Sequence, residues 1–212
     1  MRHNRGLYDA IKRTIDVGVG AIGLIITFPI QLGVAAAVLA TLGKPVFFRQ
    51  ERPGKNKKVF ELVKFRTMLL PDEDHVTDEQ RMTRLGSFLR STSLDELPTL
   101  WNVFKGDMSL VGPRPLLVSY LDRYSPEQAR RHEVRPGITG LAQVSGRNQV
   151  SWEQRFQLDV HYVDNRSLKL DFKILLKTVS YVVNRKGISQ VGHATMTPFT
   201  GSRRPGANNA SS

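Results

Sequence analysis

The chain has two adjacent carboxylates, Asp95 and Glu96, just ahead of a proline in STSLDELPTLWNVFKGD, residues 91–107. Carboxylate pairs serve as metal ligands and as acid–base groups in many active sites. The local sequence favours a structural role, because Ser93 and Glu96 have the spacing of a helix capping box. Apolar residues then follow at helical spacing, at Leu97, Leu100, Trp101 and Phe104. This segment therefore predicts a helix N-terminus, where the helix dipole favours acidic side chains.

Arginines occur in two further segments that are rich in glycine and proline. GDMSLVGPRP, residues 106–115, places Arg114 between two prolines, which fix the backbone on either side. This segment is either a simple turn or a rigid contact for an anion. VRPGITGLAQVSGRN, residues 134–148, contains Arg147 and three glycines. Such glycines let backbone amides approach a ligand closely, but they equally mark hairpin turns.

Short strands and helices are predicted to position these residues. Two short segments around a Pro-Gly-Lys-Asn turn predict a hairpin of strands 46–50 and 59–65. The second strand would project Lys64 and Arg66 onto one face. A short helix in RMTRLGSFLRS is expected to end near Arg90. WEQRFQLDVHYV and DFKILLKTVSYVV predict two amphipathic helices, the second of which could pack in the core or lie at a membrane interface.

The segment VGVGAIGLIITFPIQLGVAAAVLATL, residues 17–42, contains no charged residue. As a helix it is long enough to cross a hydrocarbon core of about 30 Å. A cleavable signal peptide fits less well, because its apolar region typically has about 7–15 residues. Basic residues flank both ends, so the positive-inside rule draws both toward the cytoplasm. A helix broken at Pro29 that enters and leaves by one face satisfies these constraints, while a single tilted span stays open.

Composition narrows the classes of function. The 212 residues include 31 Lys and Arg against 19 Asp and Glu, a formal net charge of +12. This charge indicates an anionic partner: nucleic acid, an anionic membrane face or a phosphorylated substrate. The chain has no cysteine, which excludes disulfides and thiolate chemistry. There is no Walker loop, G-x-G-x-x-G, H-E-x-x-H or G-x-S-x-G, so nucleotide-fold, zinc-protease and hydrolase interpretations lose support.

Four segments in chain order closely resemble the small monotopic phosphoglycosyl transferases of the bacterial sugar transferase family. They are KRTIDVGVGAIGLIITFPI, KFRTM, LRSTSLDELPTLWNVFKGDMSLVGPRP and VRPGITGLAQVSGRN, and the resemblance runs from about Lys12 to Thr197. It implies a mixed, helix-rich α/β cytoplasmic body with interfacial amphipathic helices and an N-terminal re-entrant membrane helix broken at Pro29. The expected divisions are a membrane helix in residues 1–43, a catalytic domain in 44–200 and a disordered tail in 201–212.

The reaction implied by the resemblance transfers a sugar 1-phosphate from a UDP-sugar to undecaprenyl phosphate and releases UMP. This is the first membrane step of bacterial glycoconjugate synthesis. Asp95 would be the nucleophile that forms a phosphosugar-enzyme intermediate. Glu96 would either hold Mg²⁺ together with Asp95 or manage the proton of the incoming polyprenyl phosphate. The resemblance places substrate contacts at Lys64, Arg90, Arg114, Gln143 and Arg147, of which Gln143 would meet the nucleotide or the sugar.

The resemblance also implies a location and a set of partners. The expected location is the cytoplasmic face of the bacterial inner membrane, with UDP-sugar, undecaprenyl phosphate and membrane lipid as partners and no nucleic acid; a homodimer is left open. The C-terminal GISQVGHATMTPF resembles relatives that use amino-deoxy sugars. It favours UDP-N,N'-diacetylbacillosamine, or a related sugar, over UDP-galactose or UDP-glucose. The family's membrane helix breaks at a Ser-Pro pair, whereas here Phe28 precedes Pro29 and offers no hydroxyl to the helix backbone.

A rival interpretation is a membrane-anchored basic protein that binds nucleic acid or anionic lipid without catalysis. It would account for the charge and the apolar segment but not for the ordered loops and the paired carboxylates. A nucleic-acid groove needs aromatic side chains interleaved with basic ones, and the aromatics here lie mainly at apolar helix positions. A catalytically inactive protein of the same fold is a third alternative, against which Asp95 and Glu96 argue.

Overall fold

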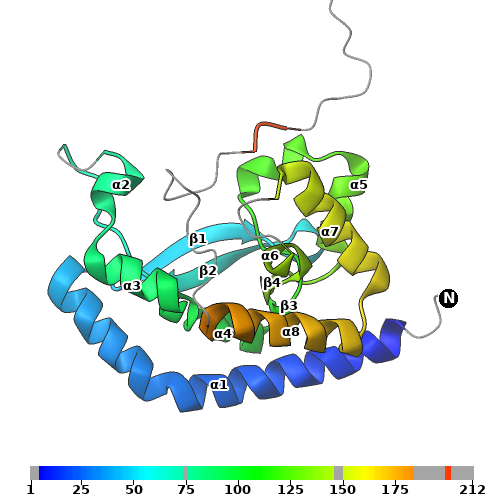
Figure 1. The fold of residues 1–212 in the computed structure, drawn as a ribbon, viewed down its shortest axis with the longest axis horizontal. Helices are drawn as coiled ribbons and strands as arrows, with labels where there is room; N and C mark the ends of the chain where they lie inside the picture. Colours follow the sequence, from blue (N-terminus) through cyan, green and yellow to red (C-terminus); the bar gives the residue numbers. More distant parts are fainter. Residues whose placement is uncertain (1–4, 74–75, 146–149, 184–198, 202–212) are drawn as a thin grey trace, which may run out of the picture.

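The computed structural model describes residues 5–73, 76–145, 150–183 and 199–201. They form a helix-rich body around two small sheets, with the long helix α1 along its base in Figure 1, so the predicted mixed, helix-rich class is confirmed. The strands are β1 Phe47–Pro53, β2 Val59–Phe65, β3 Ser109–Val111 and β4 Gly137–Thr139. The α-helices are α1 Arg5–Leu42, α2 Asp78–Arg81, α3 Arg84–Thr92, α4 Thr99–Lys105, α5 Pro126–Ala129, α6 Leu141–Val144, α7 Trp152–Asn165 and α8 Leu168–Val183. The 3-10 helices are η1 Lys55–Lys57, η2 Leu94–Glu96, η3 Val118–Arg123 and η4 Arg130–Glu133.

Helix α1 is continuous for 38 residues and bends near the middle of its length (Figure 1). Pro29 lies inside it and has no backbone N–H to donate to the preceding turn. The Thr27 hydroxyl donates to the Gly23 carbonyl at 2.6 Å and accepts from Gln31 Nε2 at 2.9 Å. Back-bonding of this kind also bends helices. The break predicted at Pro29 is therefore a bend in a continuous helix, and Thr27 supplies the hydroxyl that Phe28 lacks.

The apolar part of α1 is mostly exposed. Among the described residues, α1 is the only helix long and apolar enough to cross a membrane, and only 11% of its most apolar stretch is buried. The core helix of a water-soluble protein would instead be largely covered. The large exposed apolar side chains in its middle are Val19, Ile22, Ile25, Ile26, Phe28, Ile30 and Leu32. An apolar surface of this extent supports association with a membrane.

Helix α1 is fixed to the rest of the chain by short contacts. A Cβ on Gly20 would lie 3.3 Å from the backbone nitrogen of Phe104, so the small residue lets α4 approach α1 closely. Arg13 donates to the Phe104 carbonyl at 2.8 Å, near the C-terminus of α4, where a cation is favoured. The buried Asp16 accepts the backbone N–H of Leu110 at 3.0 Å. These contacts attach the apolar helix rigidly to the body.

A buried carboxylate ties α1 to α7 and α8. Asp171 of α8 accepts hydrogen bonds from the Tyr162 hydroxyl of α7 at 2.7 Å and from the Tyr8 hydroxyl of α1 at 2.8 Å. Lys12 of α1 pairs with the same carboxylate at 2.9 Å. A buried charge is tolerated when it is paired and hydrogen-bonded in this way. The first half of α1 and the two long C-terminal helices therefore form one unit.

The predicted hairpin is confirmed. β1 pairs antiparallel with β2, from Phe47 opposite Phe65 to Pro53 opposite Val59. Helix α4 covers the other edge of β2, because the buried Asn102 accepts from the Val63 amide at 3.2 Å and donates to the Glu61 carbonyl at 2.7 Å. An unpaired strand edge must be covered to avoid open backbone donors and acceptors. Asn102 thus fixes the distance between β2 and the segment that carries the two carboxylates.

The capping box predicted at Ser93 is wrong. Ser93 has a left-handed backbone with φ 58°, ends α3, and makes no side-chain capping bond to the next turn. Residues Leu94–Glu96 form the 3-10 turn η2, and α4 begins only at Thr99. The predicted apolar face of α4 is also only partly buried, since Trp101 and Phe104 are exposed. The face turned toward β2 carries polar side chains because it hydrogen-bonds the strand edge.

β3 and β4 form a parallel pair in which glycine backbones touch. A Cβ on Gly112 would lie 2.4 Å from the Arg135 carbonyl oxygen, and one on Gly137 would lie 2.1 Å from the Gly112 nitrogen. Real Cβ atoms do not approach other atoms so closely, so both positions require glycine. Up to residue 145, where the description of this segment stops, the second glycine-rich segment forms the strand β4 followed by α6, and not a hairpin turn.

Candidate active site

Asp95 and Glu96 lie on η2 and are surrounded by basic side chains from three other parts of the fold. Lys64 comes from β2, Arg90 from the last turn of α3 and Arg114 from the loop after β3. All three interact electrostatically with Asp95. The structure thus brings together five of the residues predicted for the site.

Glu96 is held between two cations. Its Oε1 accepts hydrogen bonds from Lys64 Nζ and from Arg114 Nη2, the latter at 3.0 Å. Burial opposes ionisation, but the charges of Lys64 and Arg114 outweigh it and lower the pKa of Glu96 to about 2. Glu96 is therefore ionised at any physiological pH, and its second oxygen accepts no hydrogen bond from the described residues. A carboxylate held in this way is a poor proton acceptor.

Asp95 has the opposite electrostatic environment. It is only 9% exposed and accepts no hydrogen bond within the described part of the chain. Burial and, next, the charge of Glu96 raise the pKa of Asp95 to about 6, against the opposing effect of the nearby cations. A desolvated carboxylate without hydrogen bonds is more reactive than one in water. The two neighbouring acids thus differ in environment in the way that separates catalytic roles.

Arg90 is held in place by the segment that follows β2. Its Nε donates to Thr67 Oγ1 at 3.0 Å, and its Nη2 lies 3.0 Å from Met68 Sδ. Burial lowers the pKa of Arg90, and the charge of Asp95 opposes this effect. A Cβ on Gly86 would lie 1.8 Å from the Thr67 carbonyl oxygen, so only glycine lets α3 come close enough. This packing directs Arg90 toward Asp95.

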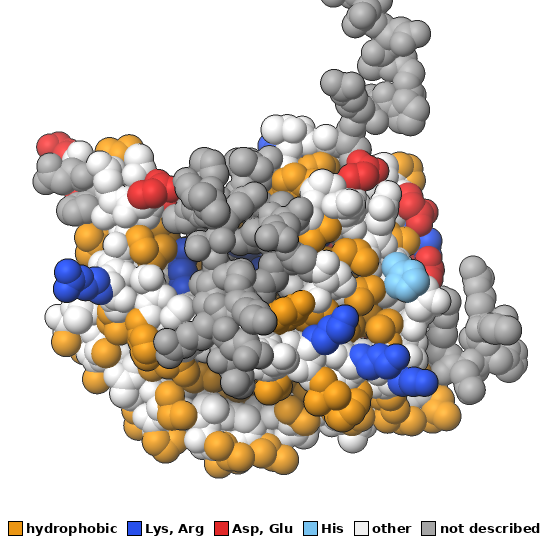
Figure 2. Space-filling view, viewed as in Figure 1, with side chains coloured by type: hydrophobic (Ala, Val, Ile, Leu, Met, Phe, Trp, Pro, Cys, Tyr) orange, Lys and Arg blue, Asp and Glu red, His pale blue; other side chains and the backbone are white. Residues whose placement is uncertain are grey.

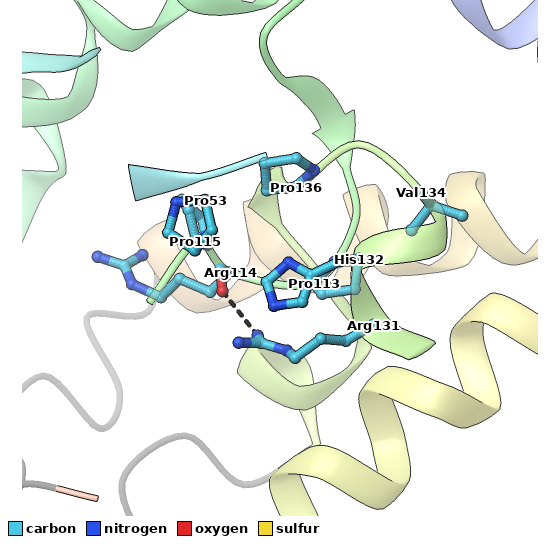
Figure 3. A pocket seen from close by; sticks show the side chains of 8 residues that line it. All are labelled: Pro53, Pro113, Arg114, Pro115, Arg131, His132, Val134 and Pro136. Carbon is cyan, nitrogen blue, oxygen red and sulfur yellow. Dashed lines mark hydrogen bonds between the residues drawn. The ribbon is translucent and has the colours of Figure 1, made fainter. Parts of the chain in front are cut away.

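The loop around Arg114 is held from behind by a buried ion pair. The Arg114 backbone carbonyl accepts a hydrogen bond from Arg131 Nη2 at 2.7 Å, drawn as a dashed line in Figure 3. Arg131 pairs with Asp159 of α7 at 2.8 Å, and both side chains are only 2% exposed. The loop borders a pocket lined by Pro53, Pro113, Arg114, Pro115, Arg131, His132, Val134 and Pro136. Figure 3 shows the Arg114 guanidinium pointing away from Arg131, which leaves it free to reach Glu96.

Two features of the site could not be found from local sequence. Arg52 of β1 donates to the Pro115 carbonyl at 3.2 Å and has no carboxylate partner among the described residues. Burial and, next, the charge of Arg114 lower the pKa of Arg52 to about 10. The Arg131–Asp159 pair is the second feature. In both cases the partners lie far apart in the chain, so no spacing pattern connects them.

Gln143 and Arg147 stand apart from this group. Both polar atoms of the Gln143 side chain are buried without a hydrogen-bond partner in the described structure. A Cβ on Gly140 would lie 2.7 Å from Gln143 Oε1 and 2.1 Å from the Gly112 carbonyl oxygen, so this amide lies near the start of the Arg114 loop. No described contact joins Gln143 to the two carboxylates. Arg147 lies outside the described residues.

The carboxylates that could hold a metal ion are few. Across the residues that the structure describes, no group of three or more His, Asp or Glu side chains is arranged for a metal. Mg²⁺ usually takes one or two carboxylates and completes its shell with water and substrate phosphates. Asp95 and the free oxygen of Glu96 fit that limited donor set. The surrounding cations would attract a phosphorylated substrate to the same place.

Comparison with known proteins finds a family model and several relatives that are described as sugar transferases. The family model described as bacterial sugar transferase matches residues 7–185. An uncharacterized sugar transferase, EpsL, of Bacillus subtilis is 52% identical over 91% of this chain and 96% of that protein. A UDP-glucose:undecaprenyl-phosphate glucose-1-phosphate transferase of Caulobacter vibrioides is 42% identical over 81% of this chain and 69% of that protein. A UDP-galactose-lipid carrier transferase of Erwinia amylovora is 40% identical over 84% of this chain, which spans only 41% of that longer protein.

Proposed function

Because the chain belongs to the bacterial sugar transferase family, we propose that it transfers a sugar 1-phosphate from a UDP-sugar to undecaprenyl phosphate and releases UMP. One observation carries the proposal. The carboxylate of Asp95 is buried, accepts no hydrogen bond from the described residues, and lies beside Lys64, Arg90 and Arg114. The names of several relatives describe transfer of a sugar or a sugar phosphate to undecaprenyl phosphate or a lipid carrier. A site for such a reaction needs a nucleophile and positive charge next to each other.

In the first step, an oxygen of Asp95 attacks the β-phosphorus of the UDP-sugar. The bond between this phosphorus and the bridging oxygen breaks, and UMP leaves with the bonding electrons. Asp95 then carries the sugar phosphate as an acyl phosphate. Lys64, Arg90 and Arg114 reduce the repulsion between two anions, which would otherwise oppose the attack. Arg52, beside Arg114, adds further positive charge.

In the second step, a phosphate oxygen of undecaprenyl phosphate attacks the phosphorus of the acyl phosphate. The bond to Asp95 breaks, the carboxylate is restored, and undecaprenyl diphosphate-sugar is released. Two displacements through a covalent intermediate replace one difficult displacement between phosphates. Glu96, with a pKa of about 2, acts by holding Lys64 and Arg114 in position and not by accepting a proton.

Asp95 and Glu96, which are adjacent and carry no third carboxylate beside them among the described residues, are the two residues that would hold Mg²⁺. When bound, this ion would neutralise charge on the diphosphate of the donor. The free oxygen of Glu96 is suited to this purpose because its other oxygen already holds two cations.

The identity of the transferred sugar is a more specific proposal than the reaction class. The C-terminal segment GISQVGHATMTPF favours UDP-N,N'-diacetylbacillosamine or a related amino-deoxy sugar, and almost all of it lies outside the described residues. Relatives bear names that specify galactose or glucose, and the name of the B. subtilis relative specifies no sugar. Gln143 is the proposed contact to the nucleotide or the sugar, because its buried side-chain amide has no hydrogen-bond partner among the described residues. Arg147 is a further proposed contact to phosphate.

We place the protein on the cytoplasmic face of the bacterial inner membrane, with α1 entering and leaving the bilayer on that face. Support comes from the exposed apolar length of α1, its bend and its basic flanks. Helix α4 packs against α1 and carries two exposed aromatic side chains, Trp101 and Phe104, whose ring centroids lie 5.7 Å apart. Aromatic side chains in such positions suit the boundary between lipid and water.

Purified full-length protein in detergent should release UMP when given undecaprenyl phosphate, Mg²⁺ and the correct UDP-sugar. The expected result is release with an amino-deoxy donor and dependence on both the lipid and Mg²⁺. A preference for UDP-galactose or UDP-glucose would contradict the proposed sugar and leave the reaction class intact. Absence of UMP with every UDP-sugar tested would contradict the proposed reaction.

The first step should depend on pH through Asp95. Since the pKa of Asp95 is about 6, the rate of UMP formation in a single turnover without acceptor should fall about tenfold per pH unit below that value and level off above it. Omitting undecaprenyl phosphate avoids the titration of its own phosphate, which occurs near pH 6. Glu96→Gln removes a charge that raises the pKa of Asp95, so it should move the midpoint to lower pH. The assignment would be contradicted if UMP and the phosphosugar-enzyme were both formed at a rate that does not change between pH 5 and 7.

A further inference from the structure

Arg52 lies on the same face of the hairpin as Lys64. In the antiparallel pair, Arg52 is opposite Phe60 and Phe48 is opposite Lys64. Opposed residues, and residues an even number apart along a strand, project to one side of the sheet. Lys64 donates to Glu96, and Arg52 lies four residues beyond Phe48, a distance of about 13 Å along the strand. This face of the hairpin therefore carries a second cation beyond the one that binds Glu96.

The Arg114 loop links this second cation to the carboxylates. Arg114 Nη2 donates to Glu96 Oε1 at 3.0 Å, and Arg52 Nη1 donates to the carbonyl of the next residue, Pro115, at 3.2 Å. Pro53 and Pro115, which follow the two arginines in the chain, line the same pocket and lie side by side in Figure 3. Arg52 is therefore next to Arg114 and one step further from the carboxylates.

Arg52 has no carboxylate partner among the described residues. Its Nη2 donates to Gln50 Oε1 at 2.5 Å, and its Nε is buried without an acceptor in the described structure. Burial and, next, the like charge of Arg114 lower the pKa of Arg52. A partly buried cation beside a second cation is costly unless an anion accompanies it. Arg52 is therefore suited to an anionic ligand.

The direction of attack in the proposed reaction requires room for a second phosphate. In phosphoryl transfer the attacking and leaving oxygens lie roughly in line. When Asp95 attacks the β-phosphorus, the phosphate of UMP leaves on the side away from Asp95. In the second step Asp95 is the leaving group, so the phosphate of the lipid enters from the side that UMP has left. Both steps therefore use one subsite beside the phosphate that is transferred.

The two molecules that use this subsite share only their phosphate. UMP carries a nucleoside, whereas undecaprenyl phosphate carries a lipid. In the proposed function that lipid comes from the membrane, toward the broad apolar surface that Figure 2 shows over α1. A subsite that serves both must recognise phosphate alone. A guanidinium suits this purpose, because its planar fork of N–H groups matches phosphate oxygens.

We propose that Arg52 binds the phosphate of UMP as it leaves and then the phosphate of undecaprenyl phosphate as it enters. The proposal rests on the reaction given under the proposed function. In the first step the electrons of the broken P–O bond pass to the bridging oxygen, so the phosphate of UMP gains one negative charge, which Arg52 stabilises. In the second step a lipid phosphate oxygen donates an electron pair to the phosphorus, and the electrons of the bond to Asp95 return to the carboxylate.

Measurement of the two half-reactions with full-length protein tests this role. UMP formation is followed in a single turnover without acceptor, and transfer is followed after undecaprenyl phosphate is added to the isolated phosphosugar-enzyme. Arg52→Gln should slow both steps by about a hundredfold, an effect typical of losing one donor to developing charge. Arg52→Lys keeps the charge and should recover part of each rate. Hydroxylamine attacks the acyl carbon and needs no second phosphate, so it should cleave the intermediate of every variant at one rate.

Arg49→Gln is the matched control, because Arg49 lies on the same strand, is exposed and pairs with Glu61 at 2.7 Å. It removes the same charge and should leave both half-reactions unchanged. An unchanged rate of either step in Arg52→Gln, or an equal loss in Arg49→Gln, would overturn the proposal. Slower cleavage by hydroxylamine in Arg52→Gln would show that Arg52 acts only through the fold, and would overturn it too. If the unchanged protein formed no phosphosugar-enzyme, the proposed reaction itself would be contradicted, which is a distinct result.

Discussion

Replacing Asp95 by asparagine is expected to lower UMP release by about a thousandfold or more, because removal of a covalent nucleophile has effects of that order. The amide has nearly the same shape as the carboxylate but cannot form the acyl phosphate. The replacement also removes a buried charge that accepts no described hydrogen bond. Folding stability should therefore be unchanged or slightly higher, and loss of activity cannot be attributed to unfolding. UMP release and thermal unfolding of the same preparation measure both effects.

The intermediate gives a second measurement of the same role. With a UDP-sugar and no lipid acceptor, the protein should gain the mass of one sugar phosphate, and hydroxylamine should remove it. Fragmentation of the peptide should place the added mass on Asp95 and not on Glu96. Asp122→Asn, at an exposed acid outside the site, should behave like the unchanged protein. Normal turnover of Asp95→Asn, or an added mass on Glu96, would show that the nucleophile is another group.

Elements with a regular repeat were predictable from sequence because their burial is local. The strands of the hairpin flank a Pro-Gly-Lys-Asn turn that marks the reversal of the chain, and α7 and α8 carry apolar residues at helical spacing. The prediction failed at Ser93 and Glu96, where a capping box was expected. There, Lys64 and Arg114 lie 32 and 18 residues away and bind the glutamate. A contact between distant segments decided the conformation, and no local spacing contains that information.

In the site, too, local spacing predicted little, and contacts between distant segments decide the arrangement. Spacing alone suggested little more than a helix start at Asp95, and the roles of the basic residues came from the resemblance to a family. The structure brings Lys64, Arg90 and Arg114 to the two carboxylates, although their roles in the reaction stay predictions. The support behind the Arg114 loop could not be predicted, because Arg131 and Asp159 are 28 residues apart and neither belongs to a motif.

The second large effect is expected at that support. Asp159→Ala leaves the Arg131 guanidinium buried, with both partners only 2% exposed in the unchanged protein. Loss of one member of a buried pair costs about 3–5 kcal/mol in the free energy of unfolding. For a chain of this length the midpoint of thermal unfolding should fall by roughly 10 °C. Asp164→Ala is the matched control, since Asp164 lies on the same helix and pairs with the neighbouring Arg130 at the surface. That loss should stay within about 1 kcal/mol.

A double replacement separates stability from the positioning of the site. Arg131→Met with Asp159→Leu substitutes apolar side chains for the buried pair, and such replacements are often neutral or stabilising. The midpoint of unfolding should then return close to that of the unchanged protein. UMP release should nevertheless be lower than in the unchanged protein, because the Arg114 carbonyl has lost the donor at 2.7 Å that holds its loop against Glu96. If activity returned together with stability, the pair would serve only the fold, and the loop would be held by its prolines alone.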